Sequence, residues 1–71
     1  PGWLLQQVSR ALGRLAPERA EAFALRVFGG LSAAETAGVL GKSESAVKML
    51  VHRALKDLRQ ILDMDLHVEE G

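Results

Sequence analysis

The apolar pattern of residues 43–62 constrains the fold more than any other feature of this chain. Ser43 can cap a helix, because its hydroxyl can accept a hydrogen bond from an N–H of the first turn, and Glu44 suits the positive end of the helix dipole. Apolar residues then recur every three or four positions, which is the spacing of one helical face. We therefore expect a long helix from about Ser43 to Leu62, with one buried face formed by Val47, Leu50, Val51, Ala54, Leu55, Leu58, Ile61 and Leu62.

The opposite face of this expected helix is mostly cationic or polar. A cationic helix face can follow a groove of DNA, with its N-terminal half nearest the bases. The ordinary alternative for a run of charges is a solvated surface without a partner. The residues of this face are Ser45, Lys48, Met49, His52, Arg53, Lys56 and Arg59.

Two shorter helices are expected in the first thirty residues. The first is amphipathic and ends near Gly13, and a single aromatic residue at helical spacing, Trp3, is expected in its buried face. Pro17 suits the first turn of the second helix, and Gly29 and Gly30 end it after about Phe28. The residues expected in its buried face are Ala20, Phe23, Ala24, Val27 and Phe28, whereas Arg19, Glu21 and Arg26 are expected to face outward.

A third helix, from about Ala33 to Leu40, has signals at both ends. Ser32 and Glu35 have the spacing of a capping box, and Gly41 suits the left-handed conformation that closes a helix. Ala37 is small enough to let the next helix cross closely. A short helix, a turn of about three residues and a longer helix form a helix-turn-helix. The expected fold is all-α: a compact bundle of about four helices with a helix-turn-helix and a long C-terminal recognition helix.

Composition narrows the class of protein. The 71 residues allow one small domain, and there is no cysteine and no run of apolar residues long enough for a membrane span, which fits a cytoplasmic protein. The net charge of zero hides a basic segment, 42–61, followed by an acidic one, so we expect a domain of residues 1–62 and an acidic tail of residues 63–71. The tail can fold back as an autoinhibitory arm or extend the helix. The start at Pro1, without an initiator methionine, suggests a domain excised from a longer protein.

No catalytic or cofactor site is expected. His52 lies among cations and His67 in the acidic tail, and neither is near a nucleophile or at the spacing of metal ligands. A weak metal site in the tail, formed by His67 with Asp65, Glu69 and Glu70, is less favoured than a solvated tail. The sequence therefore predicts a binding protein without enzymatic activity, cofactor or metal.

The order and spacing of several short motifs resemble region 4 of bacterial sigma factors, and the extracytoplasmic-function group in particular, from about Leu4 to Leu62. The resemblance implies a four-helix domain that binds the −35 promoter element in the major groove and docks on the β flap of core RNA polymerase to direct transcription initiation. The motifs are Leu25-Arg26, Gly30-Leu31-Ser32 with Glu35, Ala37, Leu40 and Gly41, then Ser43, Val47-Lys48, His52-Arg53-Ala54 and Leu58-Arg59.

The resemblance also implies roles for individual residues. Arg53 is the strongest candidate because it can pair with a guanine edge or a phosphate. The helix N-termini at Ser32 and Ser43 can present free N–H groups to phosphates. The expected DNA-binding residues are Ser43, Ser45, Lys48, Met49, His52, Arg53 and Lys56, and the further phosphate candidates are Arg26, Ser32 and Arg59.

Departures from the family pattern leave alternatives open. Ala46, Met49 and Leu50 stand where threonine, serine and arginine are frequent, and Thr36 replaces a usual isoleucine. Met49 can touch a thymine methyl, or it can join Leu50 in an apolar patch for a protein partner such as an anti-sigma factor. One alternative function is thus a sigma-like protein-interaction module. Another is the DNA-binding domain of a response regulator, although the added first helix and the long last helix favour a sigma factor.

Overall fold

The computed structural model describes residues 2–70, with side chains described as far as Asp63. Its four helices are α1 (Gly2–Gly13), α2 (Pro17–Val27), α3 (Ala33–Leu40) and α4 (Glu44–Glu70). The all-α class and the four-helix arrangement expected from the sequence are therefore confirmed.

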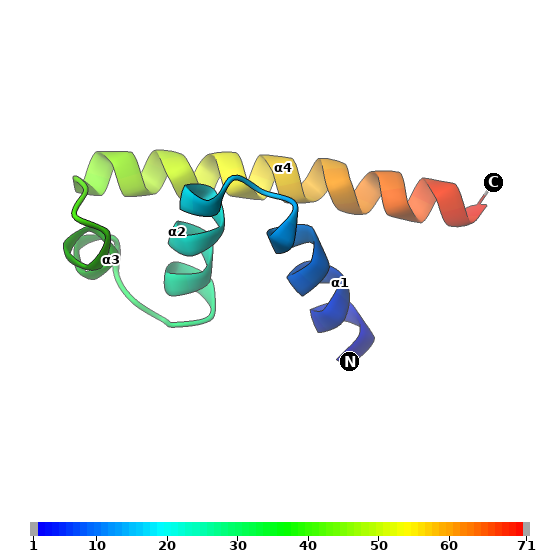
Figure 1. The fold of residues 1–71 in the computed structure, drawn as a ribbon, viewed down its shortest axis with the longest axis horizontal. Coiled ribbons are helices and arrows are strands. Elements are labelled where there is room, and N and C mark those ends of the chain that lie inside the picture. The colour runs from blue at the N-terminus through cyan, green and yellow to red at the C-terminus, as the bar shows by residue number, and fades with distance from the viewer. Residues whose placement is uncertain (1, 71) are drawn as a thin grey trace.

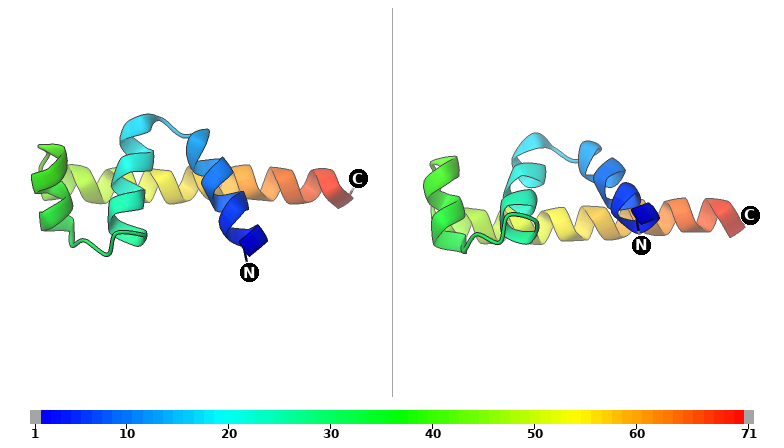
Figure 2. Two further views of the ribbon diagram at one scale, coloured as in Figure 1. Left: turned by 60° about the horizontal axis from the view of Figure 1, so that its bottom comes forward. Right: turned by 90° about the horizontal axis from the view of Figure 1, so that it is seen from below.

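The long helix α4 forms one side of the molecule, and the three shorter helices lie along the other (Figure 1). They follow one another along α4 in reverse chain order, with α3 at its N-terminal end, α2 next and α1 further along (Figure 2). Each of them packs against α4. Because α4 reaches beyond the other helices, the molecule is elongated, with extents of 43 × 21 × 14 Å.

The core lies between α4 and the shorter helices. Val47, Ala54 and Leu58 are buried on the face of α4 predicted from the spacing. Ala54 and Leu58 pack with Phe23 of α2 and Ala11 of α1, and three partly buried leucines and one isoleucine border this cluster. Alanines at the helix crossings let the backbones approach closely, and Ala37 of α3 is buried as expected. The single core is small, as a chain of this length requires.

Local sequence signals set both ends of α3. The Ser32 hydroxyl accepts a hydrogen bond from the Glu35 N–H (3.0 Å), and a Glu35 carboxylate oxygen accepts one from the Ser32 N–H (2.8 Å). At the other end Gly41 has a φ of 66°, and the Lys42 N–H donates to the Ala37 carbonyl (3.0 Å). The capping box and the left-handed glycine are both confirmed.

The local backbone geometry requires glycine at both positions after α2, Gly29 and Gly30. The helix ends at Val27, with Phe28 as its cap residue. A Cβ at Gly29 would lie 2.7 Å from the Leu25 carbonyl oxygen, and Gly30 has a φ of 70°. The loop therefore needs the close approach of one glycine and the positive φ of the other.

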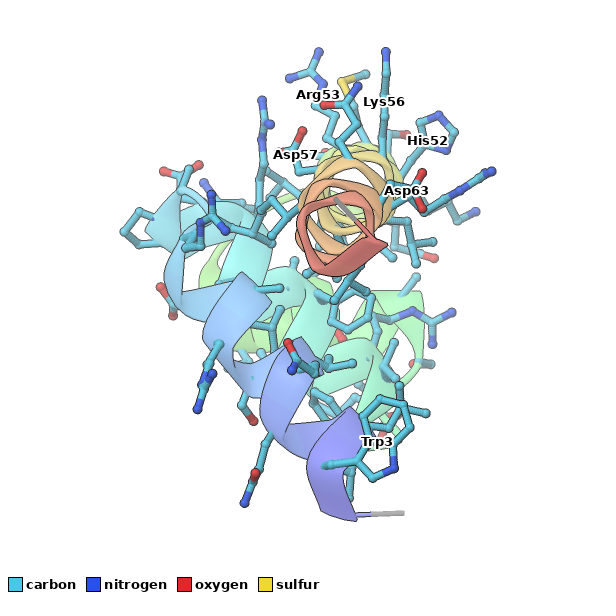
Figure 3. The ribbon with its side chains drawn as sticks, turned by 90° about the vertical axis from the view of Figure 1, so that its right-hand side faces the viewer. Trp3, His52, Arg53, Lys56, Asp57 and Asp63 are labelled. Carbon is cyan, nitrogen blue, oxygen red and sulfur yellow. The ribbon has the colours of Figure 1, made fainter. Side chains whose placement is uncertain are left out.

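Four residues expected in the core lie at the surface. The N-terminal half of α1 points away from α4, so Trp3 is 62% exposed (Figure 3). Val27 and Leu55 are exposed too. Phe28 is also exposed, although its ring makes an edge contact with that of Phe23 at 6.1 Å. The spacing identified most of the buried face of α4, but it missed Ala22 of α2, which is fully buried. Only the part of an apolar face at a helix crossing is buried.

The last helix is longer than expected. It continues past Leu62 to Glu70, so the expected boundary at residue 62 falls within one helix. The backbone of the acidic segment extends the helix and does not fold back on the basic face (Figure 1). The side chains of Asp65, His67, Glu69 and Glu70, and with them the metal alternative, lie outside the described residues.

Candidate nucleic-acid interface

The candidate interface is the face of α4 that points away from the other three helices. With α3 and the turn Gly41–Ser43, α4 forms the expected helix-turn-helix. Figure 3 shows His52, Arg53 and Lys56 extending from α4 on the side opposite α1. Every residue predicted for this face is exposed: Ser45, Lys48, Met49, His52, Arg53, Lys56 and Arg59.

The fixed cations of this face are available to a ligand. Lys48, Arg53, Lys56 and Arg59 make no hydrogen bond or ion pair with any residue whose side chain the structure describes. They spread around roughly half of the helix circumference, since successive residues are about 100° apart. A polyanion lying along α4 can therefore meet several cations without breaking existing ion pairs.

The N-termini of α3 and α4 are the two helix ends predicted as phosphate sites. Ser43 caps α4, its hydroxyl accepting from the Ala46 N–H at 3.1 Å. At α3, both partners of the capping box are engaged, and the Glu35 carboxylate carries a negative charge there. The pKa of Glu35 is lowered, first by the hydrogen bond from the Ser32 backbone and then by that with its side chain, so the carboxylate is ionised at neutral pH. The first turn of α4 also carries an acid, Glu44, so both helix N-termini combine a capping serine with a nearby carboxylate.

Arg26, a further phosphate candidate, holds the loop between α2 and α3. One terminal nitrogen of its guanidinium donates to the Leu31 carbonyl at 2.6 Å. The side chain is exposed, and a guanidinium has five N–H donors, so other donors remain for a phosphate. Its hydrogen bond fixes where the cation sits, beside the start of the helix-turn-helix.

Two ion pairs tie the start of α2 to the helix-turn-helix. Arg19, expected to face outward, donates to the carboxylate of Asp57 on α4. Glu18 pairs with Lys42 in the turn, with 3.5 Å between charged atoms. Lys42 therefore forms an ion pair with Glu18, whereas the sequence pattern placed it in the basic segment without a partner. The sequence signal for the Arg19–Asp57 pair was the acidic residue Asp57 within a mostly basic helix.

Near its middle, α4 carries an open depression formed by His52, Leu55, Lys56, Arg59, Gln60 and Asp63. All of these residues lie on one helix, so the depression is an open surface and not an enclosed cavity. Asp63 is exposed and follows the last cation of this face, Arg59, one helical turn further along α4. Among the described residues, no group of three or more His, Asp or Glu side chains could hold a metal.

The two members of the predicted apolar patch differ in exposure. Met49 is 52% exposed, whereas Leu50 is only partly accessible. Leu50 therefore contributes mainly to packing, and Met49 is the apolar side chain that a base or a protein could contact. No helix in the described part of the chain is long and apolar enough to span a membrane.

Comparison with known proteins places this arrangement in a family. The family described as "Sigma-70, region 4" matches residues 5–58. The chain is 47% identical over 55 residues to the ECF RNA polymerase sigma factor BldN of Streptomyces coelicolor. The matched segment covers 78% of this chain and 21% of that protein.

A solved structure supports the same assignment. The 1.8 Å structure of the RsbN–BldN complex superposes with a TM-score of 0.76 and 43% identity, over 79% of this chain and 41% of the matched chain. This chain therefore spans less than half the length of either protein chain that it matches. Region 4 belongs to transcription factors, which are not enzymes. The chain is a member of the sigma-70 region 4 family, within the extracytoplasmic-function group of sigma factors.

Proposed function

We propose that this domain binds the −35 promoter element, with the N-terminal half of α4 in the major groove. The observation that carries the proposal is the exposed cationic face on the second helix of a helix-turn-helix, whose cations have no ion-pair partner among the described side chains. Such a helix presents its N-terminal residues to base edges, while cations along it contact phosphates. The proposed base-contacting residues are Ser45, Lys48, Met49, His52 and Arg53, and the proposed phosphate contacts are Ser43, Lys56, Arg59 and Arg26.

Arg53 is the residue on which the proposal is tested. Arg53→Ala is expected to cost about 1–3 kcal/mol of specific binding, because an arginine at a guanine edge or phosphate supplies charge-assisted hydrogen bonds. The measurement is fluorescence anisotropy against a pool of short duplexes at low salt and then at rising salt. Parental binding should be selective for sequence and should weaken as salt rises.

The control for this test is Arg10→Ala, which removes one exposed cation from α1, on the other side of the molecule. It is expected to leave the affinity close to that of the parent. Circular dichroism should report the same helicity for both variants, because neither side chain is buried. Equal affinities of Arg53→Ala and the parent for the selected duplex would exclude Arg53 from the interface.

Docking on core RNA polymerase is the second part of the proposal. Membership of the family supports a contact with the β flap. We propose a cytoplasmic location for the same reason, because bacterial transcription takes place there. A purified flap segment titrated against the domain should shift backbone NMR signals in one contiguous surface. Signals that stay unchanged throughout the titration would contradict direct docking.

A solved complex of a relative and the exposure of Met49 together favour a protein partner for this domain. A relative with 43% identity was solved in complex with a second protein, RsbN, and Met49 is exposed among the cations. We propose that a partner of the anti-sigma type covers Met49 and competes with DNA. Adding RsbN should then displace a bound duplex, and Met49→Gln should weaken the displacement more than it weakens DNA binding. Simultaneous binding of RsbN and DNA would contradict this competition.

A further inference from the structure

Asp57 is placed where it could neutralise the most important cation of the proposed interface. It lies four residues after Arg53 on α4, a spacing at which side chains on a helix are neighbours and opposite charges attract. Figure 3 shows the two side chains leaving α4 next to each other. If they paired, the pair would have to break before Arg53 could bind DNA.

The structure shows a different partner for Asp57. A terminal nitrogen of Arg19, from the first turn of α2, donates to the Asp57 carboxylate. The two side chains are 33% and 30% exposed, so the ion pair is partly shielded from water. Arg53, by contrast, is exposed and makes no hydrogen bond or ion pair with a described residue. The carboxylate is therefore held on the α2 side of the helix.

We infer that Arg19 is a positioning residue for the DNA-binding face: by holding Asp57, it leaves the Arg53 guanidinium available to a phosphate or a guanine. The inference rests on the proposed function. Its physical basis is that Arg19, a cation on α2 outside the DNA-binding face, neutralises the Asp57 carboxylate. Without Arg19, Asp57 would pair with Arg53 and make its guanidinium less available to DNA.

The test begins with Arg19→Met, which keeps most of the aliphatic stem and removes the charge. Its dissociation constant for the selected duplex is expected to rise about two- to fivefold, because the competing Arg53–Asp57 pair is a solvent-exposed helix pair of modest strength. Arg19→Lys should bind nearly as the parent does. Arg10→Ala is the matched control, since it loses the same charge without touching Asp57. A loss as large for Arg10→Ala as for Arg19→Met would overturn the inference.

Double variants separate positioning from the other roles of Arg19. Arg19→Met should have no further effect once Arg53 is replaced by alanine, and Asp57→Ala should restore binding in the Arg19→Met background. Asp57→Ala in the parent should change the affinity much less. If Arg19 contacted DNA itself, or only held α2 in place, its loss would matter equally with and without Arg53. That result would overturn the inference.

An NMR measurement without DNA tests the same idea independently. Rotation of the Arg53 guanidinium about its Cζ–Nε bond should be fast in the parent, slower in Arg19→Met and fast again when Asp57→Ala is added. Slow rotation in the parent, or unchanged rotation in Arg19→Met, would overturn the inference. If Arg53→Ala does not affect DNA binding, the proposed interface fails, while this measurement still reports whether Arg19 controls Asp57.

Discussion

Thr36 is a polar residue buried among the apolar residues of the core. It is fully buried in α3, and its hydroxyl oxygen has no hydrogen-bond partner among the residues that the structure describes. A buried hydroxyl that loses its hydrogen bonds to water without replacing them costs about 1–3 kcal/mol. The family resemblance implies isoleucine at this position, so an apolar side chain suits the site. We therefore expect Thr36 to lower the free energy of unfolding of the domain.

Thr36→Val should raise the free energy of unfolding by about 1 kcal/mol, because valine has nearly the same shape and no hydroxyl to desolvate. Chemical denaturation monitored by circular dichroism measures the change. Thr36→Ser is the control, since it keeps the hydroxyl and loses a methyl group, and it should be less stable than the parent. A less stable valine variant would show that the hydroxyl has a partner in solution.

At the scale of single helices, the stability of the short helix α3 depends on the hydrogen bonds at its ends. It has eight residues, too few for a stable isolated helix, and its capping box satisfies N–H groups that the helix leaves free. The same box gives α3 a dependence on pH. The Glu35 pKa is lowered from its ordinary value of 4.5 by the hydrogen bonds from Ser32. The folded state thus favours the ionised carboxylate.

Because the folded-state pKa is the lower one, the stabilisation by Glu35 is fully present above the ordinary glutamate pKa. It is lost as pH falls from there through the folded-state value. Glu35→Gln can still accept a hydrogen bond but does not titrate, so its melting temperature should fall less than that of the parent between neutral and strongly acidic pH. Ser32→Ala, which disrupts the box, should also reduce the dependence. If the melting temperatures of the parent, Glu35→Gln and Ser32→Ala changed identically with pH, a role for the Glu35 carboxylate would be contradicted.

At the scale of the whole molecule, α4 is both the support of the fold and the candidate interface. Each of the shorter helices packs against α4, and the core lies along one of its faces. The two roles do not conflict, because the buried and cationic residues occupy opposite sides of one helix. Substitutions on α4 should therefore affect either folding or binding, depending on the face.

Leu58→Asp should unfold the domain, since an unpaired buried charge costs several kcal/mol and a core of this size supplies about 3–5 kcal/mol. Trp3→Ala should change the stability by less than about 1 kcal/mol, because most of its side chain is already in water. Thermal melting followed by circular dichroism compares the two. Cooperative melting of Leu58→Asp at the parental temperature, or unfolding of Trp3→Ala, would contradict this division between core and surface.

The sequence by itself determined the features that depend on neighbouring residues. The starts of α3 and α4, the left-handed Gly41 and the cationic face of α4 all follow from hydrogen bonds and periodicity within a few residues. The helix-turn-helix could be predicted for the same reason. The candidate binding residues remain predictions, although their exposure agrees with that role.

Only the tertiary structure decided which parts of the apolar faces are buried and which charges meet. Trp3 is exposed because α1 contacts α4 only near its C-terminal end, and helical spacing does not state where helices cross. Arg19 and Asp57 are 38 residues apart, so no local pattern relates them. Their ion pair exists because α2 crosses α4 at that point, and crossing points are set by the packing of the whole core.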